Sequence, residues 1–207
     1  PSAAQDVYNN QALADITGDP AGAYGKRPAL FPLEAAEAPA RASRAAYARI
    51  HPLLVERASR GLVRRIHGDL HLGNIVLLEG RPVLFDAIEF DDSLATIDVL
   101  YDLSFLLMDL GKRGLGSHAN AVLNAYLDVE RSSGMLLGLA ALPLFLSMRA
   151  VIRAKVEILR ASKADRGETK EQALSEARGC VELACDSLAR GDGPRLVALG
   201  GSRVRRQ

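Results

Sequence analysis

The sequence predicts an α+β fold that is mostly helical and contains one β-hairpin. Two short apolar runs, 75–78 and 82–85, flank the turn-forming residues 79–81, which is the pattern of a hairpin. Beyond residue 94, apolar residues recur at helical spacing almost to residue 190. The chain has 207 residues, of which 48% are hydrophobic, so it can form one domain with a buried core.

Two segments precede the first strand-like run, 62–66. Residues 1–39 are predicted to be an irregular leader, because the first 35 of them are rich in Ala, Pro, Gly and Asn and show no sustained alternation. Residues 40–60 are predicted to form a helix, because their apolar residues share one face: Ala46, Tyr47, Ile50, Leu53, Leu54 and Val55.

Helices are also predicted at 94–110, 119–130, 135–160 and 171–190, with loops at 111–116 and 161–170. The first of these helices is strongly apolar, so we expect it to be buried. It would carry Asp98 and Asp102 on one face, because they are four residues apart. A buried Asp102 needs partners, which the loop backbone or His67 could supply. The alternative is that this face of the helix is solvated.

The predicted helix at 135–160 contains Pro143, which should break or kink it. Its apolar part, 135–148, has about 14 residues and is too short to span a membrane. Arg149, Arg153 and Glu157 follow at four-residue spacing. This spacing predicts a solvated, ion-paired ridge or, alternatively, a contact to phosphate or substrate.

Composition limits the possible binding partners of the chain and the cellular compartment in which it is expected. The net charge is +1, so no strong field attracts the chain to nucleic acid or to a membrane. Cys180 and Cys185 are five residues apart in a predicted helix, where they point to different faces and cannot form a disulfide. Two free thiols, and the absence of a signal-peptide pattern, favour the cytoplasm.

The polar run after the first strand-like segment has the spacing H-x-D-L-x-x-x-N of a kinase catalytic loop. It is His67-Gly68-Asp69-Leu70-His71-Leu72-Gly73-Asn74, and the hairpin should bring Asp86, just past the return strand, back towards it. Phosphoryl transfer needs a carboxylate that orients the acceptor hydroxyl, and oxygen ligands that hold Mg²⁺ against the phosphates. Asp69 suits the first task, and Asn74 and Asp86 suit the second.

Other polar residues near the loop have less certain tasks. We expect His67 to pack and hydrogen-bond behind the loop, whereas His71 either faces the acceptor or phosphate or lies on the surface. Zinc is not expected, because no third His or Cys lies nearby at zinc-ligand spacing. The acidic residues Glu89, Asp91 and Asp92 form either a solvated loop that caps the next helix, or a second metal ligand or contact to a cationic substrate.

The sequence resembles the aminoglycoside phosphotransferase family, which has a protein-kinase-like fold. Within that family it is most similar to the branch fused to a C-terminal P-loop kinase domain. The resemblance covers about residues 40–190 and is specific between 62 and 110, in the runs 67–75, 84–90 and 97–104. The third run departs from the family pattern G-D-P-x-x-D-L-A at Ile97, Val99 and Ser104.

The resemblance implies a site and its cofactors, ATP and Mg²⁺. Asp69 would be the catalytic residue, and Asn74 and Asp86 would be the magnesium ligands. His71, as the loop residue that could face a phosphate, joins these two ligands as a candidate cofactor contact. Asp102 would support the catalytic loop.

We expect residues 40–190 to be a kinase-like C-terminal lobe without its N-terminal lobe. The only lysine before the loop, Lys26, lies in a segment flanked by Gly and Pro rather than on a strand. Residues 196–199 are predicted to form a strand, yet 202–207 lack the pattern of a P-loop. Residues 191–207 are therefore predicted to be the truncated start of a P-loop domain or a disordered tail, and the chain a fragment of a longer parent.

The function predicted from these features is ATP- and Mg²⁺-dependent phosphoryl transfer to a small-molecule hydroxyl. Without a phosphate-binding lysine and Gly-rich loop, we expect the chain alone to be weakly active or inactive. One alternative is a non-catalytic, kinase-like binding or regulatory module. Another is a metal-dependent hydrolase, which would release phosphate with no acceptor present. The sequence does not identify the acceptor.

Overall fold

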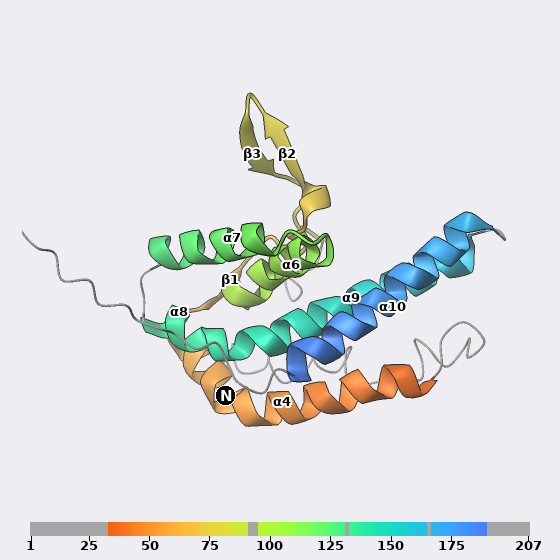
Figure 1. Ribbon diagram of the computed structural model, residues 1–207. Helices are drawn as coiled ribbons and strands as arrows, with labels where there is room; N and C mark the ends of the chain where they lie inside the picture. The colour runs from red at the N-terminus through yellow and green to blue at the C-terminus, as the bar shows by residue number, and fades with distance from the viewer. Residues whose placement is uncertain (1–32, 91–94, 131–132, 165–166, 190–207) are drawn as a thin grey trace, which may run out of the picture.

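The computed structural model describes residues 33–90, 95–130, 133–164 and 167–189. Helices make up most of this part of the chain, and two small antiparallel sheets of two strands accompany them (Figure 1). The predicted α+β, mostly helical class is therefore confirmed. Lys26, Asp91, Asp92 and the predicted strand at 196–199 lie outside the described residues.

The elements follow one another along the chain in an order that places the strands between the first helix and the helical bundle. They are α4 (Leu33–Ser59), β1 (Val63–Arg65), the 3₁₀ turn η1 (Leu72–Asn74), β2 (Ile75–Leu78), β3 (Arg81–Leu84), β4 (Thr96–Asp98), α6 (Val99–Lys112), α7 (Gly116–Val129), α8 (Ser133–Gly138), the 3₁₀ turn η2 (Leu139–Ala141), α9 (Leu142–Lys163) and α10 (Glu168–Ala189).

The first helix begins earlier than its side-chain pattern predicted. Helix α4 starts at Leu33, inside the stretch predicted to be an irregular leader, and ends at Ser59. Its apolar stripe is as expected, because Ala46, Ile50 and Leu54 recur every four residues and are all buried. Helix boundaries are harder to predict than helix cores, because Ala and Glu favour a helix without revealing where it starts.

The predicted hairpin is confirmed and projects away from the helices (Figure 1). Strands β2 and β3 pair antiparallel, from Ile75 opposite Leu84 to Leu78 opposite Arg81. The connecting Glu79 and Gly80 both have positive φ, 51° and 75°. Two consecutive residues of this kind form the tight turn whose twist matches that of paired strands.

The predicted helix at 94–110 is wrong at its start. Residues 96–98 form strand β4, which pairs antiparallel with β1, and helix α6 begins only at Val99. Asp98 is the N-cap of α6, and its carboxylate accepts a hydrogen bond from the N–H of Leu100. Asp98 and Asp102 therefore do not share a helix face. The physical reason is that Asp stabilises a helix at its cap more than in its interior.

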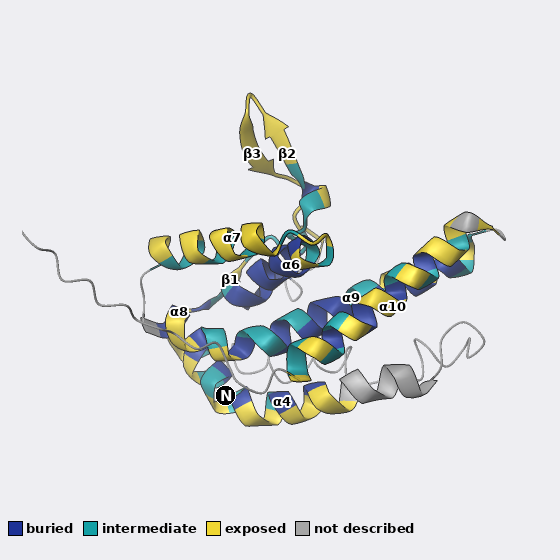
Figure 2. Cartoon of the chain, viewed as in Figure 1, coloured by how far each residue is buried: buried dark blue, intermediate teal, exposed yellow. Residues whose placement is uncertain are grey.

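The helical core consists of α6, α9 and α10, with α4 and α7 packed around them. Helices α9 and α10 run side by side over most of their lengths, and α6 is buried along nearly its whole length (Figures 1 and 2). Pro143 marks the expected break, because α8 and η2 end before it and α9 begins one residue earlier, at Leu142.

Helix boundaries elsewhere lie within a few residues of those predicted. Helix α7 begins at Gly116, α9 extends to Lys163 and α10 begins at Glu168. The stretch Gly134–Lys163 has the length and hydropathy of a membrane-spanning segment, but 56% of its most apolar part is buried inside the fold. That burial is expected of a core helix.

Candidate active site

The loop between β1 and η1 is held by backbone hydrogen bonds on both sides. The N–H of Ile66 donates to the carbonyl of Ala95 (2.8 Å), and the N–H of Ile88 donates to the carbonyl of His67 (2.9 Å). Gly68 has φ 83°, and a Cβ there would approach the Ile88 side chain to 2.8 Å. Only glycine combines this conformation with so close a contact. The segment after the hairpin is thus fixed against the loop.

Asp69 and Asn74 are joined directly. The side-chain amide of Asn74 donates hydrogen bonds from Nδ2 to the backbone carbonyl of Asp69 (3.0 Å) and to its Oδ2 (3.1 Å). Asn74 is buried, whereas the Asp69 carboxylate is partly exposed. The amide therefore orients the carboxylate through Nδ2, and its own oxygen, Oδ1, takes no part in these two hydrogen bonds.

Asp86 lies two residues after β3, at the base of the hairpin. It is exposed and has φ 60°, a conformation that Asp adopts more readily than most residues. Asp69 and Asp86 line one open hollow of about 590 Å³, together with residues 87–90. The hairpin therefore returns Asp86 to the side of the loop on which Asp69 is exposed.

The chemistry of these side chains is compatible with a magnesium ion. Within the described residues there is no group of three or more His, Cys, Asp or Glu that could hold a metal. Mg²⁺ does not need such a group, since it is commonly bound by one or two protein oxygens plus water and substrate phosphates. Asn74 Oδ1 and the Asp86 carboxylate are oxygen donors of this kind.

Asp102 supports the loop from the first turn of α6. Its carboxylate accepts hydrogen bonds from the N–H groups of His67 (3.0 Å) and Gly68 (3.1 Å), and Arg149 Nη2 lies 3.9 Å from Oδ1. Burial raises the pKa of the Asp102 carboxyl above its ordinary value, and the Arg149 guanidinium and the loop N–H groups offset part of that rise. The loop backbone is thus the partner that a buried Asp102 requires.

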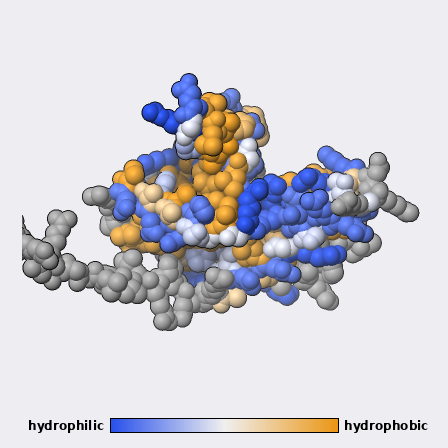
Figure 3. All heavy atoms as spheres, turned by 45° about the horizontal axis from the view of Figure 1, so that its top comes forward, coloured by the Kyte–Doolittle hydropathy of each residue, from blue (hydrophilic) through white to orange (hydrophobic). Residues whose placement is uncertain are grey.

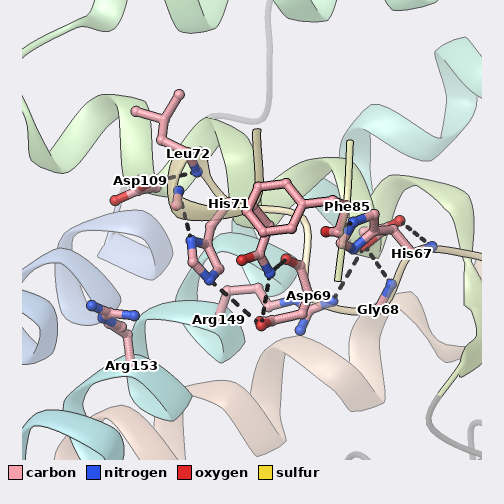
Figure 4. Close-up of polar contacts among 12 residues, drawn as sticks. His67, Gly68, Asp69, His71, Leu72, Phe85, Asp109, Arg149 and Arg153 are labelled. Carbon is pink, nitrogen blue, oxygen red and sulfur yellow. Dashed lines mark hydrogen bonds and ion pairs between the residues drawn. The ribbon is translucent and has the colours of Figure 1, made fainter. Parts of the chain in front are cut away.

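The two histidines of the loop have different surroundings (Figure 4). His67 Nε2 is 2.8 Å from the carbonyl of Phe85, and its buried Nδ1 has no hydrogen-bond partner among the described residues. His71 Nδ1 accepts a hydrogen bond from the N–H of Gly73 (3.0 Å), and its Nε2 is 3.5 Å from Asp69 Oδ2. His67 therefore lies behind the loop, while His71 lies beside the Asp69 carboxylate.

Arg149, Arg153 and Glu157 were predicted to form a solvated ridge, and for Arg149 this prediction is wrong. Arg149 is buried, and its guanidinium stacks over the rings of Tyr101 (3.9 Å) and Phe105 (4.8 Å). Arg153 does pair with Glu157 (2.9 Å), but this carboxylate is buried rather than solvated. A planar, weakly hydrated guanidinium can be buried on aromatic rings, which spacing along one helix does not reveal.

Two further contacts were not predicted from the sequence. Asp98 forms a buried ion pair with Arg57, whose Nε and Nη2 donate to its carboxylate at 2.6 and 2.7 Å. Asp109, near the end of α6, accepts a hydrogen bond through Oδ2 from the N–H of Leu72 (3.0 Å). Together with Asp102, Asp109 holds the loop 67–74 at two points along α6.

Residues 12–137 match the model of the phosphotransferase enzyme family. The matched stretch is more than half of the chain and contains the loop, the hairpin and α6. The chain belongs to the phosphotransferase enzyme family. Membership in this family relates the chain to phosphoryl transfer, and the matched stretch includes Asp69, Asn74 and Asp86.

The chain is also similar to curated proteins from mycobacteria. It is 32% identical over 153 residues to an uncharacterized protein of Mycobacterium bovis and to uncharacterized proteins of two Mycobacterium tuberculosis strains. These alignments cover 72% of this chain and 28% of each relative, so the chain spans less than a third of their length. No solved structure matches the chain significantly.

Proposed function

We propose that this chain carries the catalytic loop of an enzyme that transfers the γ-phosphoryl group of ATP, with Mg²⁺, to a hydroxyl of a small molecule. Family membership supports phosphoryl transfer in general. The finer assignment rests on one observation: the Asn74 amide orients the Asp69 carboxylate at the edge of the same hollow that Asp86 lines. We infer that a nucleotide's phosphates meet the acceptor at this hollow, with Asp69 as the base and with Asn74 Oδ1 and the Asp86 carboxylate as the oxygen donors.

Asp69 is the catalytic residue in this proposal. It orients the acceptor hydroxyl and receives its proton as the hydroxyl oxygen forms a bond to the γ-phosphorus. The bond between that phosphorus and the bridging oxygen breaks, and ADP leaves. Bound Mg²⁺ supplies charge neutralisation for the phosphates, and Asn74 Oδ1 and the Asp86 carboxylate are the atoms that would hold it.

The remaining loop contacts position these groups. The Asp102 carboxylate accepts hydrogen bonds from the N–H groups of His67 and Gly68, the two residues before Asp69. The backbone at this point of the loop therefore cannot rotate freely. His71 lies beside the Asp69 carboxylate, within reach of a phosphate or an acceptor. We propose that the parent protein supplies an N-terminal lobe and a P-loop domain, consistent with the greater length of the relatives. We also propose that it acts in the cytoplasm, without nucleic acid or membrane partners.

The first test is titration calorimetry of the 207-residue chain with Mg·ATP. We expect binding, and we expect Asp86→Asn to weaken it by roughly tenfold or more, because a charged magnesium ligand is lost. Asparagine is the appropriate substitution, since it tolerates the positive φ of Asp86. Glu182→Gln, an exposed charge change on α10, is the matched control and should leave binding unchanged.

A second variant separates catalysis from binding. Asp69→Asn should keep Mg·ATP binding and abolish transfer to any hydroxyl acceptor, including the slow transfer to water. Measurable turnover that is equal in Asp69→Asn and the wild type would exclude Asp69 as the catalytic residue. If Mg·ATP binding is unchanged in Asp86→Asn, the magnesium assignment is wrong. If the wild type does not bind Mg·ATP at all, the alternative of a non-catalytic module is favoured for this chain.

A further inference from the structure

A charged cavity lies next to the catalytic loop, on the helical side of the molecule. It has a volume of about 660 Å³ and is formed by the end of α6, the second half of α9 and the first half of α10. That volume is in the range of small-molecule sites, roughly 300–1,000 Å³. Figure 3 shows a strongly hydrophilic surface beside the apolar hairpin, in the region of α9 and α10.

Cations outnumber carboxylates in the described lining of this cavity. Three acidic side chains contribute, and each has a cationic partner: Asp109 with Arg113 (3.2 Å), Glu176 with Lys112, and Glu157 with Arg153 and Arg160 (2.9 Å each). Five cationic side chains line it: Lys112, Arg113, Arg153, Arg160 and Lys163. The described lining is therefore net positive.

Glu157 shows that the excess of positive charge is built into the fold. Its carboxylate is 1% exposed and forms ion pairs with both Arg153 and Arg160. One buried carboxylate can balance only one guanidinium, so the pair of arginines retains a positive charge facing the cavity. Arginine presents several N–H donors in a planar fork, which suits a carboxylate or phosphate ligand.

The cavity is connected to the catalytic loop through Asp109. Asp109 lines the cavity and accepts a hydrogen bond from the N–H of Leu72. Leu72 is three residues after Asp69 in the loop. Its other carboxylate oxygen pairs with Arg113, a cation of the cavity. Arg153 is drawn in Figure 4 on the same side of the loop as His71 and Asp109. Asp109 is thus the residue through which the cavity and the loop are joined.

We propose that this cavity binds the anionic group of the phosphate acceptor, so that the acceptor is a small hydroxyl compound that also carries a carboxylate or a phosphate. The proposal rests on the proposed function and adds the substrate class. The cations hold the anionic end, and the hydroxyl end is directed to Asp69. A cationic acceptor would be repelled by the same cavity.

The test uses the isotope-labelled 207-residue chain, observed by NMR without ATP or Mg²⁺ at about 150 mM salt, where weak surface attraction is screened. Three probes differ in one group: glycerol 3-phosphate, glycerate and neutral glycerol. We expect one or both anions to shift the Arg153 Nε–H and Gln172 signals saturably, together with the N–H signals of Leu72 and Gly73. Glycerol should shift none of them.

Two arginine variants make the test specific. Arg160→Gln removes one cation of the cavity, while Glu157 keeps Arg153 as its partner. It should weaken anion binding by roughly tenfold, as expected for the loss of one charge-assisted hydrogen bond. Arg178→Gln, an equal charge change at an exposed site on α10 outside this cavity, should leave binding unchanged.

The outcomes separate this inference from the proposed function. Binding of glycerol 3-phosphate alone indicates a phosphorylated acceptor, and binding of glycerate alone indicates a carboxylate acceptor. Absence of saturable binding for both anions, or equal weakening by Arg160→Gln and Arg178→Gln, overturns the inference and leaves the Mg·ATP site unaffected. Anion binding to the cavity without Mg·ATP binding to the chain would contradict the proposed function. It would also overturn the assignment of the anion as a phosphate acceptor, and leave the cavity as an anion-binding site only.

Discussion

Asp102 links the start of α6 to the loop that carries Asp69. Its oxygens accept the N–H groups of His67 and Gly68 at 3.0 and 3.1 Å. Asp102→Asn preserves the shape but directs an NH₂ group at one of these donors. We expect the free energy of unfolding at pH 7 to fall by about 1–3 kcal/mol, measured by urea unfolding. Glu182→Gln, exposed on α10, should change it by less than about 0.5 kcal/mol.

The same residue should give the unfolding free energy a characteristic pH dependence. Burial raises the pKa of Asp102 above its ordinary value of 3.8. The folded state then binds this proton more tightly than the unfolded state, so the contribution of Asp102 decreases as the pH rises from about 3.8 through the raised pKa.

Asparagine does not titrate, so the difference in unfolding free energy between wild type and Asp102→Asn should be larger near pH 4 than at pH 7. Urea unfolding curves of both proteins across this range measure the difference. The same difference at both ends of the range would show that the pKa of Asp102 is not raised.

At the scale of elements, α8 approaches α4 and α6 so closely that only glycine fits at position 138. A Cβ at Gly138 would collide with the guanidinium of Arg57 and lie 2.7 Å from Leu100 Cδ1. Arg57 cannot move aside without breaking its buried ion pair with Asp98. The contact between these helices therefore depends on the absence of a side chain.

Gly138→Ala tests this packing directly. The backbone there is helical, so alanine meets no conformational barrier, and the collision alone should lower the unfolding free energy by about 1–3 kcal/mol. Gly179→Ala in α10 is the matched control, because nothing lies within 4 Å of its added Cβ. That change should raise stability by about 0.4–1 kcal/mol. A stabilising effect of both substitutions, measured by thermal unfolding, would refute the close packing of α8.

At the scale of the whole molecule, the hairpin exposes an apolar surface that the helical core does not cover. Leu77 is 71% exposed, and Leu78, Leu84 and Phe85 are each about half exposed. Phe90, which follows the hairpin, is 85% exposed. Figure 3 shows apolar atoms gathered in the region of the hairpin. Contiguous apolar surface of this kind promotes binding of apolar ligands and self-association.

Leu77→Lys should reduce both effects without changing the helical fold. We expect lower fluorescence of a bound apolar dye and less light scattering at high protein concentration, with an unchanged far-UV circular dichroism spectrum. Val129→Lys replaces a single exposed apolar residue at the end of α7 and should change neither signal. Equal reductions in the two variants would mean that added charge, rather than the hairpin surface, is responsible.

Local patterns were sufficient to predict the hairpin, most helices and the candidate catalytic loop. The turn at Glu79 and Gly80 specifies its own conformation, and the order of residues from His67 to Asn74 places a carboxylate and an amide at a spacing set by the loop itself. The sequence by itself therefore determined Asp69, Asn74 and Asp86 as candidates, because these residues are brought together by neighbouring elements.

Only the tertiary structure decided the contacts that support and extend this site. Asp98 ends a strand and caps a helix because β4 pairs with β1. Its carboxylate can be buried there because Arg57, 41 residues away, donates hydrogen bonds to it. Arg149 became a buried partner of the aromatic rings on α6, and Asp109 a second anchor of the loop. Such contacts join segments distant along the chain, and helical periodicity shows which residues share a face but not what that face meets.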